Sequence, residues 1–534
     1  MLQIVARFWL FRPLTLYFIV LIMLVKTFGF AVHGINATKV TVEVSIDRGL
    51  NFYIVGLADA AVKESQQRVR TALGYHDYKI PGKAVTVNMA PADIRKEGSA
   101  YDLTIAIGLL GASGQLNSEF FDKYALMGEL ALDGELRPIR GCLPIAIKAK
   151  QEGFKGIILP ALNAAEAAVV EGLEVLSANN IKEVIDFYNN GEGLEQIKID
   201  LTEKFLNRLS DVAFDFADVK GQENIKRSLE IAAAGGHNVI LIGPPGAGKT
   251  MLSKRFPSIL PPLTIEEALE TTKIHSVAGR TVKQEGLITQ RPFRSPHHTI
   301  SDVALVGGGN NPQPGEISLA HNGVLFLDEL PEFKRTVLEV MRQPLEDRVV
   351  TISRAKFSVE YPASFMLVAS MNPCPCGYFN HPEKDCVCAP GVVQKYLNKI
   401  SGPLLDRIDL HVEVTPVPFS ELSNQALAEA SKSIRERVIN ARLIQTLRFN
   451  SDSGIYCNAQ MRTADIKTHC QLSEAGYALL KTAMEKLGLS ARAYDRILKV
   501  GRTIADLEAE ETILPSHIAE AIQYRSLDRE GWAA

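Results

Sequence analysis

The sequence has almost no excess of charge, because 58 lysines and arginines face 61 aspartates and glutamates and leave a net charge of -3. This balance gives no overall attraction to nucleic acid, so any DNA binding has to use a local basic surface. Cysteine is also scarce, with seven residues in 534, which excludes a secreted scaffold held by disulfides. Hydrophobic residues make up 46% and charged residues 22% of the chain, values that fit a globular protein of roughly two to four domains.

A hydrophobic run of membrane-spanning length is missing as well. Two arginines precede an apolar run from about Leu14 to Val25, which is about 12 residues where a spanning helix needs about 20. No small-residue cleavage site follows it cleanly, as a signal peptide requires. Met23 is followed by a stretch typical of a first strand, so we expect residues 1–22 to be an over-long start and Met23 the real initiator. An interfacial anchor is the alternative.

The rest of the chain divides by its hydrophobic patterns. Short alternating strands and helices predict a mixed α/β domain over 23–188. The polar stretch 189–212 opens with a turn cluster and predicts a linker. Continuous apolar strands alternating with helices predict a parallel sheet, covered on both faces, over 213–415. From 416 to 534 the apolar spacing becomes helical, which completes a multidomain α/β chain with a C-terminal α-helical lid. Helices of this lid are expected at 418–445, 473–487, 492–509 and 515–525.

The most specific motif is NVILIGPPGAGKTML, in which an apolar strand runs into a glycine-rich loop and then a helix. Glycines in such a loop let backbone N–H groups wrap phosphates, and the helix N-terminus adds partial positive charge. Lys249 is expected to reach the β- and γ-phosphates of ATP, and Thr250 to offer its hydroxyl to Mg²⁺. The loop consists of Gly243, Pro244, Pro245, Gly246, Ala247, Gly248, Lys249 and Thr250.

Two further apolar strands end in polar residues that suit the same site. NGVLFLDELPEF ends in Asp328, a candidate Mg²⁺ ligand, and Glu329, a candidate for orienting and activating the attacking water. SFMLVASMN ends in Asn372, at the sensor 1 position, where a polar side chain contacts the γ-phosphate or the water. A plain turn residue is the alternative reading of Asn372.

Two arginines farther along are candidates for sensing or stabilising the phosphates. Arg407 stands between Asp406 and Asp409, where a ring-forming ATPase supplies an arginine finger to its neighbour's γ-phosphate. A surface salt bridge to either aspartate is the alternative. Arg492, near the start of a helix in the predicted lid, is our choice for the sensor 2 arginine, with Arg496 as the alternative.

With these residues in place, the chain resembles the ComM/YifB group of magnesium-chelatase-like AAA+ proteins from Met23 to its C-terminus. The most specific stretches are RPFRSPHHTISDVALVGGGNNPQPGEISLAHNGVLFLDELPEF, MNPCPCG and LSARAYDRILKVGRTIADL. The resemblance implies a homohexameric ATPase. For ComM-type members it implies a DNA motor that drives branch migration when incoming single strands are integrated during natural transformation. The residues that match family positions are Lys249, Thr250, Asp328, Glu329, Asn372, Arg407 and Arg492.

The long stretch between the P-loop and the acidic strand fits the helix-2 insert of this AAA+ branch. It holds the pair His297 and His298 and a triple glycine. No acid or cysteine lies near the pair in sequence, so a structural or pore-loop role is favoured over metal binding. EDRVVTISRAKFSVEYPASF reads as a β-hairpin, and in ring helicases of this branch such hairpins enter the central pore. Arg354 and Lys356 are therefore candidates for contacts to DNA phosphates, with ordinary solvated charges as the alternative.

The N-terminal domain resembles the Lon-protease C-terminal fold, which is of the ribosomal S5 domain 2-like type. Lon-type proteases use a Ser–Lys dyad. The alignment puts Ala100 at the serine position, with Ser99 one residue away, and Ala146 at the lysine position. We therefore expect a catalytically inactive domain with a scaffold or DNA-guiding role.

Four of the seven cysteines gather in CPCGYFNHPEKDCVC, between Asn372 and Arg407. The loop has few apolar residues, so a tetrahedral Zn²⁺ site would fold it by direct coordination. Free thiols or a redox disulfide are the alternatives, and His381 could replace one thiolate. We expect a zinc-stapled loop near the subunit interface. The four predicted ligands are Cys374, Cys376, Cys386 and Cys388.

Taken together, these features predict a cytoplasmic, hexameric, ATP- and Mg²⁺-dependent DNA helicase or translocase with structural Zn²⁺. Its DNA would be single-stranded and branched, and no stable membrane association is expected. A magnesium-chelatase-type motor that acts on a protein partner is the alternative. The domain at 23–188 counts against that alternative, because chelatase motor subunits usually lack it.

Overall fold

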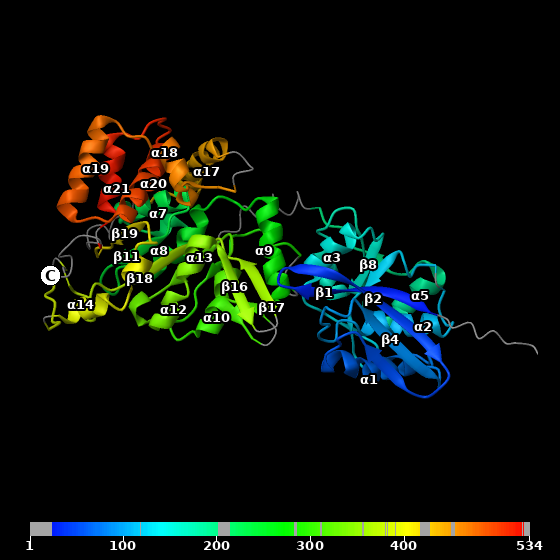
Figure 1. Ribbon diagram of the computed structural model, residues 1–534. Helices are drawn as coiled ribbons and strands as arrows, with labels where there is room; N and C mark the ends of the chain where they lie inside the picture. The colour runs from blue at the N-terminus through cyan, green and yellow to red at the C-terminus, as the bar shows by residue number, and fades with distance from the viewer. Residues whose placement is uncertain are drawn as a thin grey trace, which may run out of the picture.

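The computed structural model describes residues 24–117, 119–200, 214–281, 286–309, 312–354, 357–379, 381, 383–389, 391–416, 428–449, 454–525 and 527. Figure 1 shows an N-terminal domain (blue to cyan) beside a central core (green to yellow), with the C-terminal helices (orange to red) packed on the core. Residues 1–22, where we expect the over-long start, and Met23, the expected initiator, lie outside the described residues. Of the helices in the described ranges, none is both long and apolar enough to cross a membrane.

The N-terminal domain contains two four-stranded sheets, with strand orders β1-β2-β4-β3 and β10-β9-β8-β5. Both are mixed, since β1-β2, β2-β4 and β9-β10 pair antiparallel and the other pairs are parallel. In β2 every second residue is buried, at Val40, Val42 and Val44, as the alternating pattern predicts. The helix α2 is buried along its whole length and lies at the centre of the domain's hydrophobic core.

The elements of this domain alternate along the chain as expected. Its strands are β1 Val25–His33, β2 Asn36–Asp47, β3 Phe52–Val55, β4 Ala84–Ala90, β5 Tyr124–Leu126, β6 Glu129–Leu130, β7 Leu136–Arg137, β8 Gly156–Pro160, β9 Glu174–Ala178 and β10 Glu195–Gln196. Its helices are α1 Ala60–Tyr75, α2 Asp102–Ala112, α3 Cys142–Gln151, α4 Ala161–Ala167 and α5 Ile181–Asn190. The strand β10 falls in the stretch assigned to the linker, because two residues that pair with β9 are too few to show a period in sequence.

The core is a parallel five-stranded sheet with the order β12-β15-β18-β11-β19. The P-loop strand β11 lies between β18 and β19, and the residues of β11 and β15 are all buried. The prediction of a parallel sheet covered on both faces is thus confirmed. Because carboxyl ends of parallel strands meet at one edge, the loops after β11, β15 and β18 come together there. The sheet strands are β11 Val239–Ile242, β12 Phe293–Arg294, β15 Val324–Leu327, β18 Met366–Met371 and β19 Leu410–Glu413.

Helices and two small hairpins surround this sheet. The hairpins are β13 Gly307–Gly308 with β14 Gln313–Pro314, and β16 Val349–Arg354 with β17 Phe357–Pro362. The helices are α7 Glu223–Gly235, α8 Lys249–Arg255, α9 Ile265–Val277, α10 Asp302–Val306, α11 Glu316–Leu319, α12 Arg335–Glu339, α13 Arg342–Asp347, α14 Val392–Leu397 and α15 Gly402–Leu405. The predicted hairpin ahead of β18 is confirmed by the antiparallel pairing of β16 and β17.

The C-terminal region is helical, as predicted, although its boundaries differ. Its helices are α17 Ser431–Arg448, α18 Thr463–His469, α19 Glu474–Leu487, α20 Ala491–Leu507 and α21 Pro515–Gln523. The helix expected at 418–445 begins only at Ser431; residues 428–430 are not helical and 417–427 lie outside the described residues. The helix α18 was not predicted, because its seven residues bury only Ile466 and carry no apolar period.

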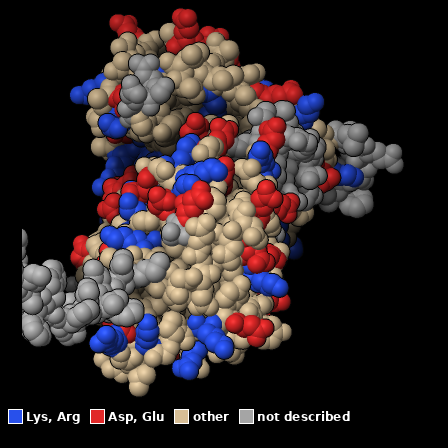
Figure 2. Space-filling view, turned by 90° about the vertical axis from the view of Figure 1, so that its right-hand side faces the viewer, with Lys and Arg blue, Asp and Glu red and all other residues tan. Residues whose placement is uncertain are grey.

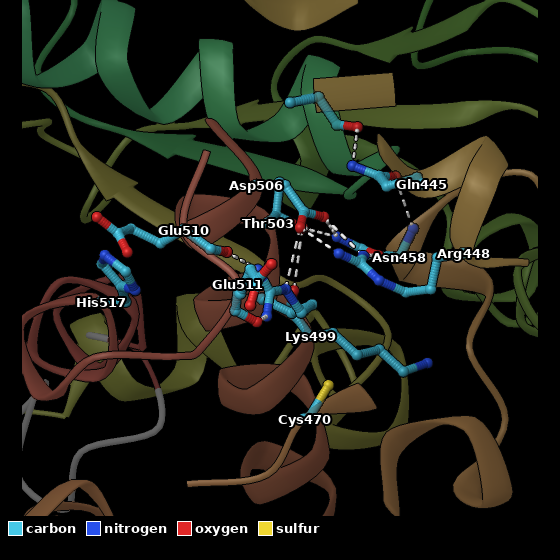
Figure 3. Close-up of polar contacts among 12 residues, drawn as sticks. Gln445, Arg448, Asn458, Cys470, Lys499, Thr503, Asp506, Glu510, Glu511 and His517 are labelled. Atoms are coloured by element: carbon cyan, nitrogen blue, oxygen red, sulfur yellow. Dashed lines mark hydrogen bonds and ion pairs between the residues drawn. The ribbon is translucent and has the colours of Figure 1, made fainter. Parts of the chain in front are cut away.

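A buried polar network joins the C-terminal helices to one another and to the core. Figure 3 shows Arg448 and Asn458 directed at the carboxylate of Asp506. Arg448 Nη1 and Asn458 Nδ2 donate to Asp506 Oδ2 over 2.8 and 2.7 Å, and Arg502 Nε donates to Oδ1 over 3.0 Å. On the same helix, Thr503 Oγ1 lies 2.8 Å from Nε2 of His237, just ahead of β11. Paired in this way, the buried charges hold α17 and α20 against the base of the P-loop strand.

The N-terminal domain contacts the core through α3 and α4, which face α9. An apolar cluster crosses this junction, with Leu143 and Val169 on one side and Leu263, Ala268 and Leu287 on the other. The Gly141 N–H donates to the Ser276 carbonyl over 3.1 Å.

Candidate nucleotide site

The side chain of the P-loop lysine forms hydrogen bonds with backbone carbonyls of the loop itself. Gly248 has a left-handed φ of 85° at the start of α8, a conformation that favours glycine. Lys249 Nζ donates to the carbonyls of Gly243 and Pro244 over 2.7 and 2.9 Å and to Asn372 Oδ1 over 3.1 Å. Burial lowers the pKa of Lys249. The structure therefore brings Lys249 and Asn372 together. The Lys249 N–H groups that donate to the loop carbonyls are the groups that would donate to phosphate oxygens.

Oxygen atoms suited to Mg²⁺ lie beside this lysine. Thr250 Oγ1 donates to Asp328 Oδ2 over 2.7 Å, and the Glu329 N–H donates to Asp328 Oδ1 over 3.1 Å. Ser370 Oγ also donates to Oδ1. A hydroxyl and a carboxylate in contact are the oxygen ligands that Mg²⁺ prefers, so the residues present fit the ion. Ser370 was missed in the sequence, where its only signal is a polar residue inside the apolar strand β18.

Glu329 follows Asp328 with its side chain turned outward. Its φ is 54° and its side chain is 59% exposed. His298 Nδ1 lies 3.8 Å from Glu329 Oε2, and the His298 ring contacts the His297 ring in a tilted arrangement with centroids 4.1 Å apart. The histidine pair thus borders the predicted catalytic carboxylate, because β12 pairs with β15 and the residues after both strands meet. The sequence offered no sign of this, since the two residues are far apart along the chain.

A cavity of about 420 Å³ opens next to Glu329 and Asn372. Tyr396, Lys395 and Lys399, from α14 and the turn after it, line its other side. Burial raises the pKa of the Tyr396 phenol. The cavity supplies room beside the predicted water-activating group, with two lysines facing it.

The predicted arginines lie in different environments. Arg407 is 7% exposed, and its Nη2 pairs with Glu346 Oε1 at 2.6 Å rather than with either neighbouring aspartate. Arg492 is exposed and pairs with Asp406 at 2.8 Å, whereas Arg496 pairs at 2.9 Å with Asp409. Asp409 is 1% exposed, so Arg496 is held in a partly buried ion pair, and Arg492 remains the sensor 2 candidate.

The DNA-contact candidates are only partly described. Arg354 ends β16, where its backbone pairs with that of Phe357, but its side chain and Lys356 lie outside the described residues. Figure 2, which looks at the side that carries the N-terminal domain, shows basic and acidic side chains interspersed. The described residues on that face form no extended surface of one sign.

The four clustered cysteines converge as predicted. Cys374 Sγ lies 3.2 Å from Cys376 Sγ and 3.7 Å from Cys386 Sγ, and the latter two are 3.6 Å apart. With Cys388 included, all four sulfur atoms lie within 4.8 Å of one another, and all are free thiols. Four sulfurs around Zn²⁺ at 2.3 Å would be about 3.8 Å apart, so the residues fit such an ion. His381 Nδ1 instead accepts the N–H groups of Glu383 and Lys384.

In the N-terminal domain, the Ser99 hydroxyl donates to the carboxylate of Glu129. Ala146 is buried in α3. The serine beside the predicted dyad position therefore has a carboxylate as its partner.

Comparison with known families matches three consecutive parts of the chain. The model "Magnesium chelatase, subunit ChlI" matches residues 215–422. "Subunit ChlI of Mg-chelatase" matches 42–163, and "Magnesium chelatase, subunit ChlI C-terminal" matches 428–525.

Individual relatives extend over nearly the whole chain. Competence protein ComM of Haemophilus influenzae is 45% identical over 498 residues, which cover 93% of this chain and 96% of that protein. YifB of Escherichia coli is 45% identical over 501 residues, with the same coverage. Lon protease 2 of Bacillus subtilis is 33% identical over 159 residues, 27% of each chain.

Proposed function

We propose that this chain, which belongs to the ComM/YifB family of magnesium-chelatase-like AAA+ proteins, is an ATP-driven DNA helicase or translocase. The family's AAA+ core implies ATPase activity. The observation that carries the proposal is the convergence of Lys249, Thr250, Asp328 and Asn372 at one sheet edge, in a chain 45% identical to a competence protein over 93% of its length.

ATP would bind with its phosphates on the loop 243–250. Lys249 would exchange its contacts to the Gly243 and Pro244 carbonyls for phosphate oxygens, and Thr250 and Asp328 would hold Mg²⁺. Bound Mg²⁺ neutralises charge that develops on the phosphates. Glu329, which lines the adjacent cavity, would orient and deprotonate the attacking water, and Asn372 would hold the water or the γ-phosphate.

The remaining roles require a second subunit. In a homohexamer, Arg407 would leave Glu346 and approach the neighbour's γ-phosphate, while Arg492 acts from the lid of its own chain. A guanidinium close to the γ-phosphate stabilises the negative charge that develops there in the transition state. The exposure of Arg492 supports its part of this proposal, because its pair with Asp406 is weak in water.

DNA is proposed as the substrate on two grounds. One is the name of the H. influenzae relative, a competence protein. The other is the hairpin β16–β17, on which Arg354 and Lys356 are the predicted phosphate contacts. The proposed activity is branch migration of single-stranded and branched DNA in the cytoplasm during natural transformation, with the N-terminal domain, of proposed Lon-like fold, as an inactive scaffold. A chelatase-type motor that acts on a protein partner is the alternative.

We also propose that the four cysteines hold a structural Zn²⁺. The sulfur spacing supports this assignment, and the loop offers little apolar surface to fold without an ion.

The test is steady-state ATP hydrolysis by the full chain, with and without single-stranded or forked DNA. DNA should stimulate hydrolysis, and Lys249→Ala should abolish both the basal and the stimulated rate. An active ATPase that DNA does not stimulate would contradict the DNA-motor assignment and favour the chelatase-type alternative.

A further inference from the structure

The four-cysteine cluster lies directly against the nucleotide site. Cys374 is fully buried and stands two residues after Asn372, whose side chain accepts from Lys249. Only Pro373 separates the two along the chain. A shift of the Cys374 sulfur is therefore transmitted to Asn372 through a single stiff residue.

A second contact joins the turn at Cys374 and Cys376 to the P-loop. Gly377, with φ 85°, is packed so closely on Pro245 that a Cβ built there would lie 2.5 Å from Pro245 Cδ. Gly377 also closes a turn, since its N–H donates to the Cys374 carbonyl over 3.0 Å. The turn that carries Cys374 and Cys376 thus rests on the loop that wraps the phosphates.

The chemistry of the cluster explains what keeps this turn in place. The four thiols lie within 4.8 Å of one another, with Cys374 buried and the other three half-buried. A soft divalent ion binds such a set as thiolates, with release of the thiol protons to solvent. Coordination then ties the turn at Cys374 and Cys376 to the returning segment at Cys386 and Cys388.

We propose that Zn²⁺ at Cys374, Cys376, Cys386 and Cys388 positions both Asn372 and the P-loop, so that ATP hydrolysis depends on a metal that touches no nucleotide. This inference rests on the proposed zinc site and ATPase activity, and it does not require DNA. The cysteines are positioning residues. Loss of the ion, by chelation or thiol oxidation, would lower the rate of ATP hydrolysis.

The two contacts predict different kinetic effects. Loss of the ion frees Cys374 and displaces Asn372, which should lower kcat about tenfold to a hundredfold, because small misplacements at a reacting centre are costly. Gly377→Ala keeps all four thiols but pushes on Pro245, so zinc content should be unchanged while the KM for ATP rises.

The experiment uses the purified full chain, with zinc measured by atomic emission and ATP hydrolysis measured without DNA. We expect about one Zn²⁺ per chain, a fall in kcat after removal with a zinc chelator under reducing conditions, and recovery when Zn²⁺ but not extra Mg²⁺ is returned. Cys386→Ser should behave like the stripped protein, whereas Cys386→His, which restores a zinc ligand, should retain zinc and kcat. The matched control is Lys384→Ala in the same loop, expected to equal the wild type.

Zinc below about half an equivalent, or a stripped chain with unchanged kcat, would overturn the inference. If Cys386→Ser does not fold, reversible stripping of the wild type still decides, with circular dichroism to verify that the chain stays folded. A zinc-dependent ATPase that ignores DNA would refute the DNA motor alone, so the two failures are distinguishable.

Discussion

Glu166 joins the N-terminal domain to the core, and its replacement by leucine should loosen that junction. The side chain is 3% exposed. Its carboxylate accepts from Thr281 Oγ1 over 2.7 Å, from the Leu143 N–H over 2.9 Å and from Ser276 Oγ. Two of these donors belong to the core, so one carboxylate binds both domains.

The expected loss of stability comes from the three buried donors that lose the Glu166 carboxylate as their acceptor. Each unpaired buried donor costs roughly 1–3 kcal/mol. Leucine also removes the cost of burying a carboxylate, a cost that shows in the raised pKa of Glu166. We therefore expect Glu166→Leu to weaken the junction by about 2–4 kcal/mol, or roughly thirtyfold to several hundredfold in the opening equilibrium. Glu166→Gln should cost less, since a hydroxyl can rotate to accept from the amide.

Hydrogen exchange followed by mass spectrometry measures this opening directly. Amides of α3 and α9 should exchange faster in Glu166→Leu than in the wild type, with Glu166→Gln in between. The control is Glu171→Leu, because Glu171 is exposed and follows α4 in the same domain. If exchange at α3 and α9 is the same in Glu166→Leu and in the control, the carboxylate does not hold the domains together.

Further predictions concern acid stability and the catalytic groups. Burial lowers the pKa of His275 from 6.5 to about 4, so the unfolded chain binds the proton first and stability is lost as pH falls from 6.5 to 4. His275→Gln should remove this loss, roughly 3 kcal/mol in the free energy of unfolding, so that its melting temperature varies less with pH over this window. An unchanged pH dependence would contradict the burial argument. Glu329→Gln should bind ATP with near wild-type affinity yet lose at least about a hundredfold in kcat, whereas a large loss of ATP binding would place Glu329 in binding instead. Arg407→Ala should be inactive alone but regain some hydrolysis when mixed with Lys249→Ala chains, as an arginine that acts across the subunit interface requires; the absence of any recovery would argue for a role within one chain.

The parts of the site that could be predicted from sequence are those in which strand and motif are contiguous. Asp328 and Asn372 each follow a short apolar strand directly, and Lys249 follows one through the glycine-rich loop, so the parallel sheet brings them to one edge. His298 and Tyr396 could not be found in this way, because their places depend on which strands and helices become neighbours. The partner of Arg407 was missed for the same reason. Sequence proximity suggested Asp406 or Asp409, but the fold directs Asp409 to Arg496 and brings Glu346 from α13.

Very short strands and helices also could not be predicted from the sequence. β10 has two residues and α18 has seven, too few for a period of two or of 3.6 to stand out. The clustering of the four cysteines could be expected from their spacing in the sequence. Their contact with the P-loop could not, since it depends on Gly377 meeting Pro245 in space.

The most direct test of the proposed DNA motor is a branch-migration assay on a three-stranded DNA substrate with the zinc-loaded full chain. With ATP and Mg²⁺ the wild type should displace the labelled strand, and Lys249→Ala should not. A wild-type chain that hydrolyses ATP at its full rate on this substrate, yet displaces no strand, would contradict the proposed function.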